Sequence, residues 1–303
     1  MPEYDKWSRW LLETRFGGDE KIAELGLRML TQLRDTLLEK ASLMGGQVLL
    51  DVGAGDGFIA FGAVEKLGPR GRVILVDISR SLLDRAREAA DKMGVTDRCE
   101  FIEASAENLS AIATESINVV TTRSVLIYVE DKLRALKEFY RVLKPGGRTA
   151  LFETVNRKEQ WRPSEIWPGV GVGLYRVEEI EPVRDLAIRL VSSLGSIPLK
   201  TMTSAGHTEY LHMCEDAGFA ATYMDLYIAS GPAPPAKIES LLKVSPNPLW
   251  PTPSELMDKI FSAEERTHFI EYMRPLVESG KGIARLSSVF IWAFKAPIPE
   301  KPW

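Results

Sequence analysis

Cysteine is scarce in this sequence of 303 residues, which contains only Cys99 and Cys214. The two cysteines form no CxxC pair and show no metal-ligand spacing, so neither a disulfide framework nor a metal site is expected. Such sparse use of cysteine favours a reducing location, and we therefore expect a cytoplasmic protein.

Long apolar runs and a strong charge of either sign are also missing. No stretch approaches the roughly 18 to 20 apolar residues that a membrane span needs, and residues 1–10 lack the apolar segment of a signal peptide. The net charge of −4 offers no basic field for a phosphate backbone. We therefore expect no membrane span and no nucleic-acid partner.

From residue 47 onward, short apolar runs alternate with helical stretches, a pattern that predicts a parallel sheet covered by helices on both faces. The predicted strands of this part are 48–50, 73–76, 99–102, 117–120 and 149–152. The helices between them are predicted over 58–67, 81–93 and 131–143. Two further strands are predicted over 220–228 and 288–294, which makes a seven-stranded α/β sheet of Rossmann-like type.

The flanking segments predict additional units around this core. Residues 1–45 show helical periodicity, interrupted by the turn Gly17-Gly18-Asp19, and are interpreted as an N-terminal helical cap. The core is assigned to 46–154, helices and a sixth strand on the substrate side to 155–230, and the seventh strand with a tail to 287–303. Residues 231–286 form a long insertion, which we interpret as a helical lid over an acceptor or a contact between copies in a homo-oligomer.

The strongest chemical signal is a glycine-rich loop between the first strand and the first helix of the core. The loop comprises Asp51, Gly53, Ala54, Gly55 and Gly57. Its glycines allow close backbone approach, and the following helix offers free N–H groups that suit a carboxylate. The spacing G-x-G-x-G differs from the dinucleotide fingerprint G-x-G-x-x-G, because Phe58 takes the place of the third glycine. A carboxylate at Asp51 opposes a pyrophosphate and favours a cationic ligand.

Asp77 and Ile78 end the second strand, 20 residues after Gly57. A carboxylate at this place can accept hydrogen bonds from both ribose hydroxyls, while Ile78 packs on an adenine face. An aspartate after a strand can also serve only as a turn or helix cap. Because it follows this loop, Asp77 is predicted to bind a ribose.

These residues resemble the class I S-adenosylmethionine-dependent methyltransferases that include the ubiquinone and menaquinone enzymes. The resemblance covers residues 46–154 and rests on the runs VLLDVGAGDG, VILVDIS, FIEASAENL and INVVTTRSVLIYVEDKLRALKEFYRVLKPGGRTALFE. It implies S-adenosylmethionine as the cofactor, an antiparallel seventh strand and an adenine contact at Ser105 and Ala106. The family often has an acid where Ser105 stands, so Ser105 is either a weaker adenine contact or a helix cap.

The resemblance also places the run after the fourth strand beside the methionine part of the cofactor and the acceptor. Arg123 is predicted to hold the cofactor carboxylate, with a substrate acid or a pairing with Asp51 or Glu130 as alternatives. Tyr128 stands near the expected acceptor, or is simply a packed aromatic. Arsenite methylation, which neighbours in the family perform, is discounted because it relies on several cysteines.

The base that an acceptor proton requires is difficult to identify. His207, which precedes a helix, and Glu153, at the end of the fifth strand, are the candidates, with a cap and a loop support as their respective alternatives. Aromatic side chains outside the core are candidates for an acceptor pocket or for ordinary packing: Tyr4, Trp7, Trp161 and Trp167.

The sequence thus predicts methyl transfer to a small-molecule acceptor, either a natural product or a quinone-like compound. The acceptor nucleophile, O, N or C, is left open. Two alternatives are a nicotinamide-dependent oxidoreductase and a catalytically silent protein that binds S-adenosylmethionine.

Overall fold

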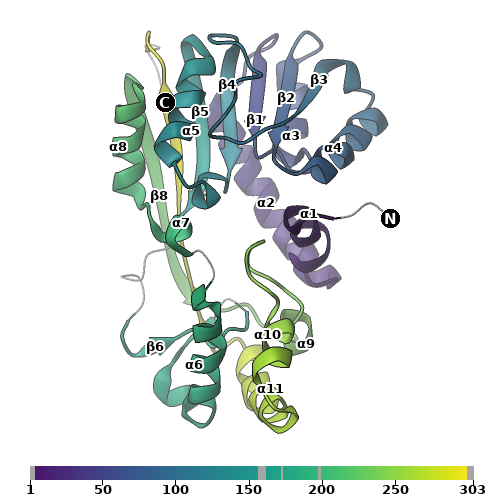
Figure 1. The fold of residues 1–303 in the computed structure, drawn as a ribbon, viewed down its shortest axis with the longest axis vertical. Coiled ribbons are helices and arrows are strands. Elements are labelled where there is room, and N and C mark those ends of the chain that lie inside the picture. The colour runs from purple at the N-terminus through teal and green to yellow at the C-terminus, as the bar shows by residue number, and fades with distance from the viewer. Residues whose placement is uncertain (1–3, 156–161, 172, 197–198, 299–303) are drawn as a thin grey trace.

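The computed structural model describes residues 4–155, 162–171, 173–196 and 199–298. Its centre is a sheet that contains nine strands in this part of the chain, in the order β3-β2-β1-β4-β5-β9-β7-β6, with β8 along the other edge of β9 (Figure 1). Strands β1 to β5 are parallel, and β9 is antiparallel to β5. The strands are β1 (Val48–Val52), β2 (Arg72–Asp77), β3 (Cys99–Glu103), β4 (Ile117–Arg123), β5 (Leu143–Thr154), β6 (Glu165–Ile166), β7 (Gly173–Arg176), β8 (Ala221–Pro232) and β9 (Ile283–Phe294).

The predicted Rossmann-like α/β class and the antiparallel seventh strand are confirmed, but the predicted count of seven strands is wrong. The additional strands are β6, with two residues, and β7, with four. Strands this short show no period-two alternation, so a segment rich in Gly, Pro and Trp gave no strand signal.

Helices cover both faces because the central strands are apolar on both sides. In β1, Leu49 faces helices α2, α3 and α4, whereas Leu50 faces α5 and α8. Both leucines are fully buried, and burying one such side chain stabilises the fold by about 1.5–3 kcal/mol. The helices of this part are α2 (Glu20–Ala41), α3 (Phe58–Leu67), α4 (Arg80–Met93), α5 (Lys132–Val142), α7 (Leu199–Thr203) and α8 (His207–Ala217), with short helices η2 (Thr96–Arg98) and η3 (Leu126–Tyr128).

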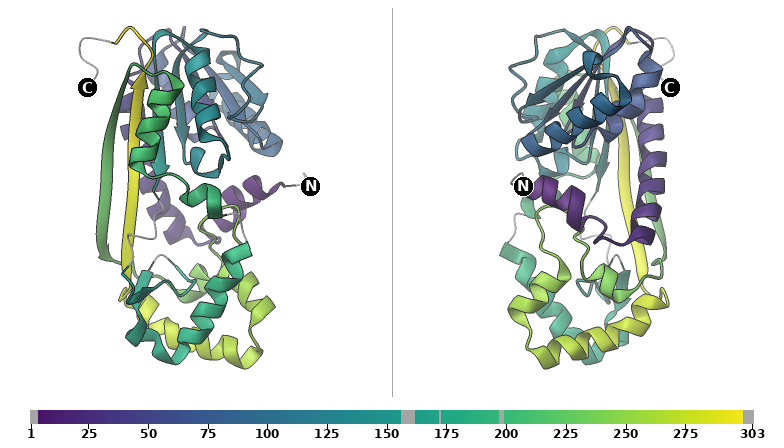
Figure 2. Two further views of the ribbon diagram at one scale, coloured as in Figure 1. Left: turned by 60° about the vertical axis from the view of Figure 1, so that its left-hand side comes forward. Right: turned by 90° about the vertical axis from the view of Figure 1, so that its right-hand side faces the viewer.

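Strands β8 and β9 form a long antiparallel ribbon, paired from Ala221 with Phe294 to Pro232 with Ile283. Only the upper half of β9 also pairs with β5, which ends at Thr154 opposite Ser288. The lower half extends beyond β5, pairs with β7 at Ile283 and Ala284, and reaches a second, smaller lobe (Figure 2). The predicted strands over 220–228 and 288–294 cover only the part of this ribbon within the sheet.

The lower lobe has an apolar core of its own, built by segments far apart in the sequence. Its helices are η5 (Val177–Val183), α6 (Arg184–Ser192), η6 (Ser193–Ser196), α9 (Ile238–Leu241), α10 (Pro253–Ile260) and α11 (Ala263–Glu278). Helices η5 and α6 do not form one continuous α-helix, because Ile180 has non-helical angles and η5 contains Pro182. The predicted domain boundaries stay a prediction.

The N-terminal segment crosses from the sheet to the lower lobe. It consists of α1 (Lys6–Arg9) and the π-helix η1 (Trp10–Thr14), followed by α2. The N-cap of α2 is Asp19, the last residue of the turn that the sequence predicts. Trp10 Nε1 donates a hydrogen bond to the carbonyl oxygen of Ser245 in the lower lobe, at 3.0 Å. Among the described residues, no helix combines the length and apolar character needed to cross a bilayer.

Candidate functional site

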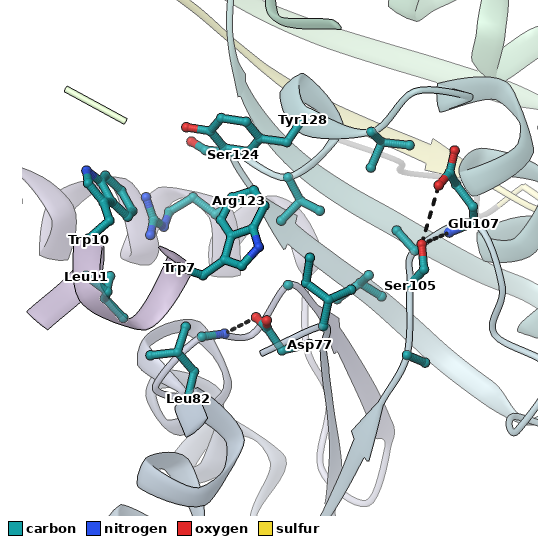
Figure 3. A pocket seen from close by; sticks show the side chains of 18 of the residues that line it. Trp7, Trp10, Leu11, Asp77, Leu82, Ser105, Glu107, Arg123, Ser124 and Tyr128 are labelled. Atoms are coloured by element: carbon teal, nitrogen blue, oxygen red, sulfur yellow. Dashed lines mark hydrogen bonds between the residues drawn. The ribbon is translucent and has the colours of Figure 1, made fainter. Parts of the chain in front are cut away.

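A cavity of about 300 Å³ lies where the carboxyl ends of β1, β2 and β4 meet the N-terminal helices (Figure 3). This edge of a parallel sheet is the general place for ligands in such folds. Its lining includes several predicted cofactor residues: Gly53, Gly55, Asp77, Ile78, Ser105, Ala106 and Arg123. Three other predicted residues, Asp51, Ala54 and Gly57, are not part of the lining and lie in the loop and strand end behind it.

The glycine loop has a backbone that other residues do not readily adopt. Gly53, Gly55 and Gly57 have φ values of 68°, 57° and 89°. A Cβ atom on Gly53 would lie 2.1 Å from Cγ2 of Val125, so the close approach of two loops requires glycine there. Helix α3 then begins at Phe58, without a side-chain cap on its first N–H groups.

Asp51 is the most unusual group of the loop, because its carboxylate is buried and only one of its two oxygens makes a hydrogen bond of good geometry. Its Oδ1 accepts a hydrogen bond of 2.8 Å from Thr121, whereas Oδ2 makes no hydrogen bond of good geometry among the described residues, although the N–H of Ala60 helps to stabilise the carboxylate. Burial raises the pKa of Asp51 to about 7, although the nearby Arg123 charge opposes this rise. Its negative charge, directly behind the cavity, favours a ligand with a cationic group.

Asp77 is fixed by two backbone donors. Its Oδ2 accepts from the N–H of Gly55 and its Oδ1 from the N–H of Ser79, both at 2.8 Å. Each oxygen retains a second acceptor site, so the carboxylate can still bind two hydroxyl groups. Burial raises the pKa of Asp77. Ile78 beside it is about half exposed and borders the cavity.

The N-terminal helix is tied to the same strand end. Asp5 caps α1 through Oδ1, which accepts from the N–H groups of Trp7 and Ser8, and its Oδ2 accepts 2.6 Å from the hydroxyl of Ser79. This contact joins residues 74 positions apart and places Trp7, Trp10 and Leu11 along the cavity.

Ser105 combines both roles that the sequence left open. Its Oγ accepts from the backbone N–H of Glu107 at 3.2 Å, as in a local cap, yet the residue also lines the cavity. Glu107 is not free, because its Oε1 accepts from the N–H of Asp131 at 2.8 Å.

Glu153 supports the loop after β4 and does not line the cavity. Its carboxylate accepts three backbone hydrogen bonds, from Val125, Leu126 and Ile127, at 2.9–3.1 Å. The side chain is fully buried, and burial raises its pKa to about 7. This bonding holds the turn in which Ser124 adopts a φ of 54°, an uncommon conformation for a residue with a side chain.

Arg123 and Tyr128 project from this loop into the cavity. Arg123 extends toward Trp10, on the side of Ser124 and Tyr128 (Figure 3). The Tyr128 ring contacts Trp7 edge to face, with 5.1 Å between ring centroids, and burial raises its pKa above the ordinary value. Tyr128 therefore stays protonated near neutral pH.

The remaining candidates lie elsewhere. His207 is exposed at the first turn of α8 and is not part of the cavity lining. Of the aromatic residues predicted outside the core for an acceptor pocket, Trp7 joins this lining. Tyr4 lines a separate hollow of about 700 Å³, and Trp167 lines one of about 800 Å³ in which it stacks on Trp250. Trp161 lies outside the described residues. Among the described residues, no group of three or more His, Cys, Asp or Glu side chains is arranged to hold a metal ion.

Sequence reasoning missed Asp5, Leu11 and Arg15 as residues near the cavity. They belong to helices assigned to a cap, and periodicity alone cannot tell which turn of a cap faces a ligand. Only the aromatic content of the segment gave a signal.

Comparisons with known proteins agree with this geometry. A family model described as a methyltransferase domain matches residues 44–167. The ubiquinone/menaquinone biosynthesis C-methyltransferase UbiE of Haemophilus ducreyi is 32% identical over 186 residues, covering 59% of this chain and 71% of that protein. An arsenite methyltransferase of Halobacterium salinarum is 37% identical over 115 residues, covering 38% of this chain.

Several matches are partial, since this chain spans 29% of the Halobacterium protein and 43% of the Klebsiella pneumoniae UbiE. Geranyl diphosphate C-methyltransferase of Streptomyces coelicolor shares the fold, with a TM-score of 0.52, 18% identity and coverage of 92% of this chain and 86% of that chain. The YcgJ protein of Bacillus subtilis also shares it, with a TM-score of 0.52, 17% identity and coverage of 86% and 97%.

The chain belongs to the family of class I S-adenosylmethionine-dependent methyltransferases. The predicted family and its cofactor, S-adenosylmethionine, are thereby confirmed. The nicotinamide alternative does not agree with this membership.

Proposed function

We propose that this protein transfers a methyl group from S-adenosylmethionine to a small-molecule acceptor, a natural product or a quinone-like compound. The observation that carries the proposal is the buried carboxylate of Asp51 at the carboxyl end of β1, directly behind the glycine loop that borders the cavity. The negative charge of this carboxylate suits the cationic amino group of the cofactor and would repel a pyrophosphate.

The residues around the cavity fit the remaining parts of this cofactor. The free N–H groups at the start of α3 suit its carboxylate, and Asp77 retains acceptor sites for the ribose hydroxyls. Ile78, Ser105 and Ala106 border the far end, where an adenine would lie.

The cofactor supplies an electrophilic methyl group on a sulfonium. Its transfer to a lone pair of the acceptor would be an in-line displacement that leaves the electrons of the carbon–sulfur bond on sulfur. The positive charge disperses, so alignment and exclusion of water suffice for much of the acceleration. Trp7, Trp10 and Leu11 cover the cavity and serve this purpose.

No strong base is required in this proposal. Glu153 is occupied by three backbone N–H groups, His207 is exposed, and Tyr128 stays protonated. We assign Glu153 to positioning the loop and Tyr128 to contact with the acceptor. The acceptor's proton, where it carries one, leaves to water after the methyl group is transferred.

Arsenite is not the acceptor we propose. Cys214 is fully buried in the core under α8, and Cys99 packs in the core on the opposite face of the sheet. Two thiols on opposite faces cannot bind one arsenic atom.

Calorimetric titration with S-adenosylhomocysteine and with NAD tests the cofactor. We expect binding of the first and none of the second, and the reverse result would overturn the proposal.

Formation of S-adenosylhomocysteine with a library of phenols, quinols and amines tests the activity and distinguishes a methyltransferase from a silent binding protein. The Gly55→Val variant should abolish product. Gly231→Val is a matched control, because a Cβ atom there meets open space.

A further inference from the structure

Two guanidinium groups near one end of the cavity make no ion pair within 4.0 Å among the described residues, although the charge of Asp56 acts on both. Arg123 lines the cavity, and Arg15 follows η1 and stacks on Trp10, with its Cζ 5.2 Å from the ring centroid. No hydrogen bond or ion pair within 4.0 Å involves either guanidinium among the described residues, so the predicted pairing of Arg123 with Asp51 or Glu130 is not formed.

This arrangement differs from the partly buried arginines elsewhere in the chain. Arg141 pairs with Glu138, Arg285 with Glu165, and Arg98 donates to the carbonyl oxygen of Gly68. Leaving a half-buried cation unpaired costs free energy, which a protein recovers when a ligand supplies the counter-charge.

The two groups also repel each other. Burial, followed by the charge of Arg123, lowers the pKa of Arg15 to about 10, although Asp56 and Tyr128 oppose the effect. Arg15 nevertheless remains charged at neutral pH. An anion near both guanidinium groups would remove the repulsion.

The cofactor alone does not supply enough negative charge. It carries one carboxylate, for which the start of α3 already offers free N–H groups, and it brings two cationic groups of its own. Even if one arginine contacted the cofactor carboxylate, the other would remain without a partner.

The surroundings of the pair are flat and aromatic. Arg15 covers the face of Trp10, and Trp7 meets Tyr128 edge to face at 5.1 Å. Such walls favour a planar ring over a flexible chain.

We propose that the acceptor is an aromatic carboxylic acid, whose carboxylate is bound by Arg15 and Arg123. This inference rests on the proposed function. The carboxylate is an anchor and is not itself methylated, so the methyl group goes to another nucleophilic atom of the same molecule.

Binding of probe molecules tests the anchor without turnover. The full-length protein is saturated with S-adenosylhomocysteine, and its affinities for 1-naphthoate and the neutral 1-naphthamide are measured by tryptophan fluorescence and calorimetry. We expect naphthoate to bind at least about tenfold more tightly, since each tenfold step equals about 1.4 kcal/mol and charge-assisted bonds supply more than this.

The Arg15→Gln and Arg123→Gln variants should each lose this preference while their affinity for naphthamide stays within about twofold, and Arg→Lys variants should recover part of it. Arg34→Gln is the matched control, because Arg34 also stacks on an aromatic ring, Phe58, but pairs with Asp35 outside the cavity. Equal binding of the two probes, or a preference kept in both Gln variants, would overturn the inference.

The outcome for the cofactor is separate. If S-adenosylhomocysteine itself fails to bind the wild-type protein, the proposed function fails. If Arg123→Gln loses S-adenosylhomocysteine binding but keeps the naphthoate preference, Arg123 belongs to the cofactor and the proposed arginine pair is wrong. Circular dichroism and thermal unfolding establish that each variant is folded.

Discussion

Asp51 and Gly53 determine much of the chemistry of the cavity at the scale of single residues. One is a carboxylate kept away from water, and the other is a position where a side chain has no room. Both belong to the loop that the sequence singled out, but neither property was visible there. Sequence spacing identifies a glycine, whereas the neighbour that excludes a Cβ atom, Val125, comes from a loop about 70 residues away.

Removing the charge of Asp51 should change the pH dependence of stability. Its pKa rises from 3.8 to about 7 on folding, so its stabilising contribution is complete below the unfolded value and is lost as the pH rises through about 7. The Asp51→Asn variant should therefore gain stability relative to wild type between pH 4 and 7. Urea denaturation at several pH values measures this difference, and a difference independent of pH would contradict the assigned pKa.

Ionisation of Asp51, which lowers the stability of the protein, should raise its affinity for the cofactor. Wild-type affinity for S-adenosylhomocysteine should increase from pH 6 to 7.5, because the Asp51 carboxylate forms while the ligand's amino group stays cationic. The Asp51→Asn variant should bind about tenfold more weakly at pH 7.5, a loss of about 1.4 kcal/mol. Calorimetry in matched buffers measures both, and a pH dependence that persists in the variant would argue against this role.

The Gly53→Ala substitution should separate the two loops that meet at the cavity. The new Cβ atom would lie 2.1 Å from Val125, and the φ of 68° strains any side chain. We expect a loss of about 1–3 kcal/mol of stability. The Gly231→Ala control, at an open position, should cost less than about 1 kcal/mol. Chemical denaturation of both proteins provides the test.

At the scale of elements, most of the sheet could be predicted because buried strands and amphipathic helices each have a characteristic local pattern of apolar residues. The strands β1 to β5 and the helices between them follow from such patterns. The short strands β6 and β7 could not be predicted, since two to four residues carry no period.

The loop after β4 depends on Glu153, which the sequence suggested as a base. Replacing its carboxylate by an amide in Glu153→Gln leaves one oxygen to accept three N–H groups, and a lost charge-assisted bond costs about 2 kcal/mol. We expect this loss of stability together with weaker S-adenosylhomocysteine binding. The control Glu100→Gln, on the exposed side of β3, should change neither. A variant with normal stability and binding but no turnover would instead indicate a catalytic Glu153.

At the scale of the whole molecule, the core of the lower lobe is separate from the two cores that cover the sheet. This separation could not be predicted, because the lobe joins residues 166–194 to residues 238–277 through contacts that leave no local pattern. Sequence analysis therefore divided the lobe between two units.

The Phe269→Ala substitution should destabilise the lower lobe selectively. Phe269 is fully buried in α11, and removing such a ring costs about 3–5 kcal/mol. Hydrogen exchange should accelerate in α6, α10 and α11, while S-adenosylhomocysteine affinity stays within about twofold. Uniform acceleration across the sheet would show that the two lobes unfold as one unit.

The ribbon of β8 and β9 sets the distance between the two lobes, and this distance can change only by whole residue pairs. Each residue pair adds about 3.4 Å, and side chains keep their faces only when pairs are added two at a time. Lengthening the ribbon in register would therefore displace the lower lobe by about 7 Å per step. The first such step would already pull Ser245 away from its hydrogen bonds with Thr14 and Trp10, so the present length and the N-terminal crossing are matched to each other.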